Sequence, residues 1–299
     1  MGHLTRRQFL TTSGKFSAAI LTADFLQGCT GRSNVRVSGH LWIYASKFPP
    51  NWDSTPVLSK VFSDFKYAGI EGVEMMEVNL RHRDVVARVG ALIEEYTLPV
   101  TGTSYGASMW DKNQHVKILE DVEHVAENLN QLGGTNFGIT VGDAGRLKTE
   151  AELDAQADVL IKILNICKPK NIQANLHNHT FEVEDDLYDL KGTLTRVPDI
   201  KLGPDLNWLI RGGVDPVAFI KTYTDQIVYM HIRDQNKEGI WTEAVGEGDT
   251  DFTAIARALQ DINYKGEVAI ELASHIPPVK DMRENWKASR TYVREVFGW

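Results

Sequence analysis

The feature that most constrains this chain is a regular alternation between short apolar runs and longer segments of helical period, which begins at Val37. Leu153, Ala157, Leu160 and Leu164 show the helical spacing, with an apolar residue at every third or fourth position. Eight apolar runs have the length and composition of buried strands. They cover residues 37–44, 72–76, 99–104, 136–141, 172–177, 201–205, 227–232 and 267–272.

Strands that alternate with helices pair in parallel through right-handed crossovers. Eight such units within about 260 residues predict a single-domain (β/α)8 TIM barrel over residues 39–299. A doubly wound open sheet is the alternative, but its glycine fingerprint should follow a strand, whereas Gly133-Gly134 follows a predicted helix. The barrel is therefore the predicted fold.

The first residues have a different composition from the rest. Thr5-Arg6-Arg7-Gln8-Phe9-Leu10 resembles a twin-arginine export signal, and Leu26-Gln27-Gly28-Cys29 resembles a lipobox. These motifs predict a signal peptide over residues 1–28, a lipid anchor at Cys29 and a tether over 29–38. We expect an exported protein, periplasmic or anchored as a lipoprotein, which meets the membrane only through Cys29. The alternative is a frayed N-terminus of a cytoplasmic protein.

The charge of the chain limits which partners it can bind, and the position of its second cysteine limits the reactivity of that thiol. The net charge is −8, and Lys and Arg form no continuous stripe, so we expect no nucleic acid partner. Cys167 falls on the apolar side of a predicted helix, where a buried thiol is inert. The sequence does not indicate an oligomeric state.

Four consecutive predicted strands end in a residue that can bind a metal. They contribute His177, Asp205, His231 and Glu271. The C-terminal strand ends of a barrel converge on one mouth, so we expect these side chains to meet there. Mixed imidazole and carboxylate donors suit Mn, Co, Zn or Fe, whereas Mg and Ca prefer oxygen alone. A divalent-metal site is therefore predicted, although each residue alone could be a hydrogen-bonded structural group.

From about Leu41 to Glu271 the chain resembles the xylose isomerase-like family of sugar phosphate isomerases and epimerases. The resemblance rests on five motifs: Gly72-Val73-Glu74, Leu176-His177-Asn178-His179, Gly203 to Pro216, His231-Ile232-Arg233-Asp234, and Gly246-Glu247-Gly248 followed by Asp251-Phe252 and Ile270-Glu271. It implies the barrel fold and a metal held by Glu, Asp, His and Glu from strands five to eight. Asp205, His231 and Glu271 match this pattern.

The fifth strand departs from the family pattern, because His177 stands at the position of the usual Glu. Family epimerases are thought to use the fifth- and eighth-strand glutamates as paired acid and base, and only Glu271 remains of that pair. Two alternatives follow: His177 is the fourth ligand and His179 moves protons, or His179 is the ligand. Trp208 is a second departure, since many relatives have His there.

Further residues are expected at the mouth to contact a substrate. Glu74 could bind a hydroxyl, Arg211 and Arg233 an anionic group or an enolate, and Trp208 a sugar face. Glu247, which lies between two glycines, is the fifth candidate for a substrate contact. Aromatic residues after strands one and three are also candidates for stacking on a sugar, namely Trp42, Tyr44, Tyr105 and Trp110.

The resemblance implies a metal-dependent isomerase or epimerase that acts on a small sugar or keto-sugar through an enediolate. Glu271, His177 or His179 would be the base that removes the α-proton. A lyase or dehydratase that eliminates from a keto-sugar or 3-keto-glycoside is the first alternative. A non-catalytic sugar-binding lipoprotein is another, and a metal-dependent phosphodiesterase or abasic-site endonuclease is disfavoured by the missing basic groove.

Overall fold

The computed structural model describes residues 35–274 and 278–299. The expected signal peptide and Cys29 lie outside this part of the chain. The first strand begins at Val37, so the last two residues of the expected tether, Val37 and Ser38, belong to the barrel. Within the described ranges no helix is both long enough and apolar enough to cross a membrane.

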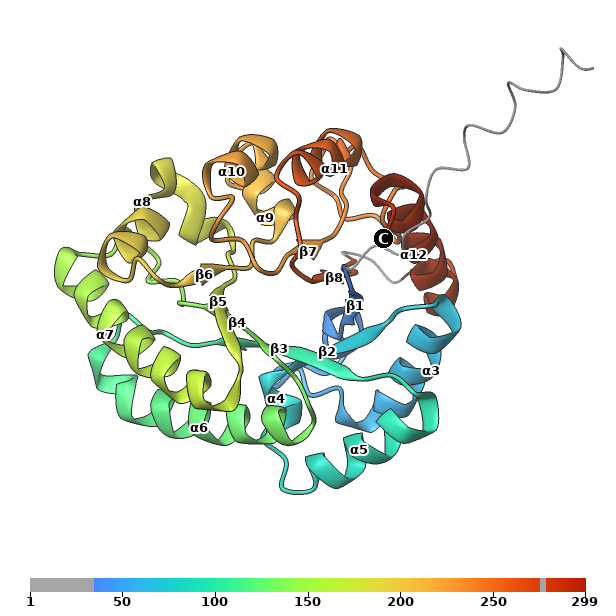
Figure 1. The fold of residues 1–299 in the computed structure, drawn as a ribbon, viewed down its shortest axis with the longest axis horizontal. Coiled ribbons are helices and arrows are strands. Elements are labelled where there is room, and N and C mark those ends of the chain that lie inside the picture. The colour runs from blue at the N-terminus through green and yellow to red at the C-terminus, as the bar shows by residue number, and fades with distance from the viewer. Residues whose placement is uncertain (1–34, 275–277) are drawn as a thin grey trace, which may run out of the picture. The chain divides into compact units, whose positions relative to one another are not determined.

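Eight parallel strands form the centre of the fold, as Figure 1 shows. They are β1 (Val37–His40), β2 (Gly72–Met76), β3 (Val100–Gly106), β4 (Asn136–Thr140), β5 (Gln173–Leu176), β6 (Lys201–Leu202), β7 (His231–Ile232) and β8 (Val268–Ile270). Their order is β6-β5-β4-β3-β2-β1-β8-β7. Parallel bridges Leu202–Ile227 and Asp205–His231 join the sixth and seventh strand segments. The predicted eight-stranded barrel is confirmed.

The strand ends differ from the predicted ones, most clearly after β1. The predicted strand 37–44 stops at His40, and Trp42–Ala45 form the short helix α2. The Trp42 backbone N–H donates to His40 Nδ1 at 3.2 Å, which turns the chain out of the sheet. Trp42 and Tyr44 therefore lie on a helical turn above the strand.

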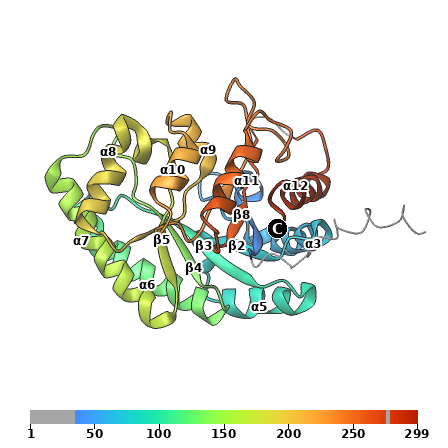
Figure 2. The ribbon, with the colours of Figure 1, turned by 45° about the horizontal axis from the view of Figure 1, so that its top comes forward.

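The longer helices lie outside the strands (Figures 1 and 2). They are α3 (Leu58–Ala68), α5 (Val85–Tyr96), α6 (His115–Gln131), α7 (Glu150–Cys167), α8 (Thr180–Arg196), α10 (Pro216–Thr222), α11 (Phe252–Asp261) and α12 (Met282–Phe297). The shorter α4 (Glu77–Leu80) and α9 (Leu206–Arg211) follow β2 and β6. Thr149 and Glu152 form the capping box expected at the start of α7, where Glu152 N–H donates to the Thr149 hydroxyl.

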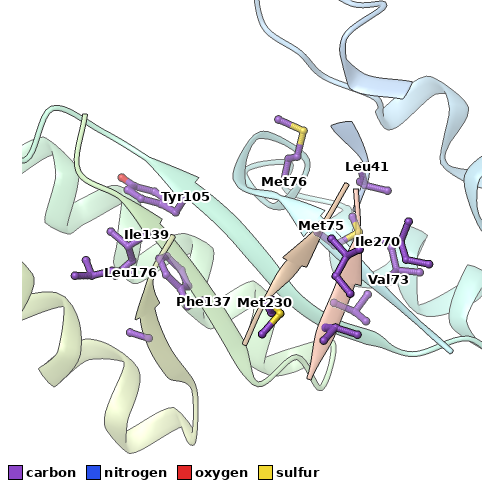
Figure 3. Close-up of a cluster of buried hydrophobic side chains, with 14 of the residues drawn as sticks. Leu41, Val73, Met75, Met76, Tyr105, Phe137, Ile139, Leu176, Met230 and Ile270 are labelled. Atoms are coloured by element: carbon purple, nitrogen blue, oxygen red, sulfur yellow. The ribbon is translucent and has the colours of Figure 1, made fainter. Parts of the chain in front are cut away.

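Apolar and polar side chains separate on the two faces of the barrel wall. Val73, Met75 and Ile270 belong to the hydrophobic core, and Figure 3 shows them among its members. Between Val73 and Met75, Glu74 points the other way and contacts Tyr229 across the barrel. Alternation with a period of two thus aims apolar residues at the helices and polar ones at the barrel axis. This separation supplies the polar groups of the site.

Candidate functional site

A cavity of about 390 Å³ opens where the C-terminal strand ends converge. This volume is within the range of small-molecule sites. Residues from β1 to β8 and the loops that follow them line the cavity: His40, Trp42, Trp52, Met76, Glu77, Ser104, Tyr105, Gly106, Gly138, Thr140, His177, His179, Trp208, His231, Arg233, Trp241 and Glu271.

His231 occupies the centre of the floor between two buried carboxylates. Its Nε2 lies 2.8 Å from Glu74 Oε2, and its Nδ1 lies 2.7 Å from Glu271 Oε2. Burial opposes the charged imidazole, but the two carboxylates outweigh it and raise the pKa of His231 to about 10. His231 is therefore an imidazolium that ties β7 to β2 and β8.

Arg233 bridges the carboxylates of Asp205 and Glu271 at the floor of the cavity. Its Nη2 lies 2.7 Å from Asp205 Oδ2 and 2.5 Å from Glu271 Oε1. Burial alone would raise the pKa of Glu271, but Arg233, followed by His40 and His231, holds it well below its usual range. Glu271 is thus an ionised carboxylate, as a general base must be.

Three of the expected metal ligands lie together. One donor atom each from His177, Asp205 and His231 falls within 4.8 Å of the others. His177 Nδ1 is buried and has no hydrogen-bond partner, and burial lowers the pKa of His177 well below its usual value. A neutral imidazole with a free nitrogen suits a metal. His231 would need to lose a proton and release one carboxylate before it could be a ligand.

Glu271, the expected fourth ligand, is not a member of this group in the described part of the chain. Its oxygens contact Arg233 and His231 instead, because those cations neutralise it at the floor. This contact places Glu271 beside the three possible ligands and on the cavity wall, where a substrate could reach it.

His179 lies outside the group of three and lines the wall. Its side chain is 35% exposed, and its Nδ1 lies 3.1 Å from the Thr140 hydroxyl. Burial, followed by the charge of Arg233, lowers the pKa of His179 to about 4, so the ring is neutral near pH 7. Glu182 accepts the His179 backbone N–H and fixes this residue at the start of α8.

Three expected substrate contacts do not line the cavity. Glu74 is 2% exposed and lies beneath His231. Arg211 lies behind the aromatic wall, with its guanidinium carbon 4.4 Å from the Trp241 ring centroid, and it donates to Gln235. Glu247 forms an ion pair with Lys280. Trp208 and Arg233 do line the cavity.

The aromatic candidates divide in the same way. Trp42 and Tyr105 line the cavity, whereas Tyr44 is buried and donates to Asp64 at 2.7 Å, and Trp110 is not among the lining residues. Tyr44 faces inward because α2 turns its ring toward Phe65.

Sequence reasoning missed several lining residues. His40 accepts the Trp42 N–H at Nδ1, and its Nε2 is 3.0 Å from the Ser104 hydroxyl. The available signal is a polar residue where the first strand ends, but the apolar run 37–44 predicts a strand that continues past His40. Trp52 and Trp241 belong to loops without periodic patterns, so the sequence offered no signal for them.

A closed parallel (β/α)8 barrel defines the TIM-barrel class, and the histidines and carboxylates at its C-terminal strand ends lie where the active sites of such enzymes are built. A model of the xylose isomerase-like TIM barrel family matches residues 62–295. Because this match covers more than half of the chain, the protein belongs to that family.

Curated relatives and solved structures agree with this assignment. The chain is similar to inosose dehydratase from Clostridium perfringens, with 23% identity over 299 residues that cover 88% of this chain and 98% of the relative. Among solved structures it is similar to D-allulose 3-epimerase from Methylomonas sp. (TM-score 0.73, 18% identity, 87% and 97% coverage). It is also similar to 3-keto-D-glucoside 4-epimerase from E. coli (TM-score 0.68, 18% identity, 87% and 99% coverage).

Proposed function

We propose that the protein is a divalent-metal-dependent isomerase or epimerase that moves a proton on a sugar or keto-sugar. One observation carries the proposal: Glu271 and His179 line the same cavity as His177 and His231, and the buried Asp205 completes a group of possible ligands with those two histidines. This places two groups that can exchange protons beside a possible metal site.

The donor set fits Mn, Co, Zn or Fe. His177, Asp205 and His231 would hold the ion, and two imidazoles with one carboxylate leave positions open for a substrate. When bound, such an ion polarises a carbonyl and lowers the cost of the charge that develops when the neighbouring C–H loses its proton. Asp205 is pre-oriented, because its Oδ1 accepts the Asn207 and Trp208 backbone N–H groups.

Glu271 is the base in this proposal. Arg233 and His231 fix its carboxylate and keep it ionised, so it can take the proton from the carbon beside a carbonyl. His179 lies on the wall, and its neutral ring can take up a proton from a substrate hydroxyl and return it to the neighbouring carbon or oxygen. Trp208, whose ring centroid is 5.3 Å from that of His179, supports a sugar face beside these groups.

Elimination is the second candidate. His177 stands in place of the expected fifth-strand glutamate, so the acid–base pair is Glu271 and His179. These two groups differ chemically, which suits the loss of a leaving group more than symmetric epimerisation. The similarity to inosose dehydratases, whose name describes a dehydration, supports this candidate.

Deuterium exchange tests both candidates. Metal-loaded protein would be incubated in D2O with inosose, D-allulose and a 3-keto-D-glucoside, and followed by NMR. We expect deuterium at the carbon beside the carbonyl of at least one compound, and no incorporation with Glu271→Gln. An isomeric product identifies the epimerase, and an unsaturated product identifies the lyase. Absence of exchange in all three metal-loaded mixtures would contradict the proposed chemistry.

We also propose that the protein is exported and anchored by lipid at Cys29. Arg6-Arg7 and the Leu26 to Cys29 motif support this proposal. A full-length protein that partitions into the membrane fraction, and a Cys29→Ser variant that leaves it, are the expected results.

A further inference from the structure

Trp52 has an unusual backbone conformation for its size. It lies in the loop between α2 and α3, its φ is +57°, and its side chain is 37% exposed at the cavity. Bulky residues rarely adopt this left-handed conformation, which glycine or asparagine tolerate more easily. Strained residues of this kind concentrate at sites that bind ligands. Trp52 therefore requires a reason beyond loop geometry.

The Trp52 ring is paired with another ring on the same side of the cavity. Its centroid lies 5.6 Å from that of Trp42, with the planes tilted by 52°. The Trp52 backbone N–H donates to the Phe48 carbonyl at 2.8 Å, which fixes the loop. Trp42 and Trp52 together form an aromatic surface that we call the first platform.

A second aromatic pair lies near the reacting groups. The Trp208 and Trp241 centroids are 5.6 Å apart, with planes at 87°. Trp208 is close to His179, and the Arg233 guanidinium carbon lies 5.4 Å from its ring centroid. This second platform follows the sixth and seventh strand segments, whereas the first follows β1. The cavity thus has two separate surfaces on which a sugar ring could stack.

Within the residues that the structure describes, the cavity lining offers no Lys or Arg that is free to bind a phosphate. Among the residues that line this cavity in the described part of the chain, Arg233 is the only Lys or Arg. Its guanidinium is already shared between Asp205 and Glu271. An uncharged carbohydrate is the ligand class that matches aromatic walls without a spare cation.

We infer that the first platform binds a second sugar ring, so that the substrate is an uncharged carbohydrate of at least two rings. The reacting ring lies against Trp208, and the next ring stacks on Trp52. This inference rests on the proposed function, because it assigns the reacting ring to the side of His179 and Glu271.

Binding of inert sugars tests the inference without catalysis. Cellobiose, maltose and trehalose contain only glucose units. Each would be titrated into the purified protein in a calorimeter, and its affinity would be compared with that of D-glucose. We expect at least one disaccharide to bind roughly fivefold or more tightly than D-glucose, and Trp52→Asn to remove that advantage. Tyr67→Ala is the control, since Tyr67 is 40% exposed and does not line the cavity.

Thermal unfolding separates a ligand platform from a structural role. Asn accepts the left-handed conformation more easily than Trp. The melting temperature of Trp52→Asn should therefore be no more than about 2 °C below that of wild type, and it can be higher. The inference is overturned if no disaccharide binds more tightly than D-glucose. It is also overturned if Trp52→Asn keeps the disaccharide advantage or melts more than about 5 °C lower. Failure of the deuterium-exchange test would leave this binding result standing, and the reverse also holds.

Discussion

Replacing Arg233 with Met tests whether the site depends on an internal cation. Arg233 is 3% exposed, and its carboxylate partners Asp205 and Glu271 are 0% and 5% exposed. The substitution leaves two buried carboxylates without that partner, and breaking such a pair costs about 3–5 kcal/mol. At about 2–4 °C per kcal/mol for a domain near this size, the melting temperature should fall by roughly 6–20 °C.

The matched control is Arg211→Met. Arg211 stacks on the same tryptophans, but its hydrogen-bond partners are neutral: Asn207, Gln235 and the Gly239 carbonyl. We expect a smaller loss of about 1–2 kcal/mol. Urea unfolding in EDTA, and again with added Zn²⁺ or Mn²⁺, measures both variants. A divalent ion should recover part of the Arg233→Met loss, because it supplies positive charge beside Asp205, and recover none of the Arg211→Met loss.

Two outcomes would refute this reasoning. If Arg233→Met lost less than about 1 kcal/mol, the carboxylates would not depend on the guanidinium. If both arginine variants lost the same free energy of unfolding, the loss would come from stacking on Trp208 and Trp241 and not from the charge of Arg233.

Three further predictions concern separate parts of the molecule. His231→Ala should lose bound metal that wild type retains after dialysis, as measured by elemental analysis, and metal retained in the variant would exclude His231 as a ligand. Burial raises the pKa of Glu182 to about 7, above the usual Glu value. Between about pH 4.5 and 7, Glu182 is therefore protonated in the folded state and ionised in the unfolded state. Stability should therefore fall by up to about 3 kcal/mol as pH rises through this window, and Glu182→Gln should lack that decrease in pH-dependent urea unfolding; parallel curves would refute it. Thr149→Ala removes the cap of α7 and should cost about 1 kcal/mol in thermal unfolding, with an unchanged melting temperature as the contrary result.

The alternation of strand and helix patterns was enough to predict the barrel, because each pattern depends on residues close together in the chain. The Thr149 cap is local in the same sense. The meeting of His177, Asp205 and His231 followed from the fold class, since parallel barrel strands all end at one mouth. These features required no knowledge of how side chains pack.

The tertiary structure decided which of the converging residues face the cavity. Glu74 and His231 are 157 positions apart (231 − 74), and only their contact across the barrel places Glu74 beneath the floor. Arg233 lines the cavity, but its guanidinium is already paired with the carboxylates of Asp205 and Glu271. Trp52 reaches the cavity through a left-handed turn that no periodic pattern encodes. Periodicity specifies which face of an element is buried, whereas partners distant in sequence are selected by packing and charge in the folded chain.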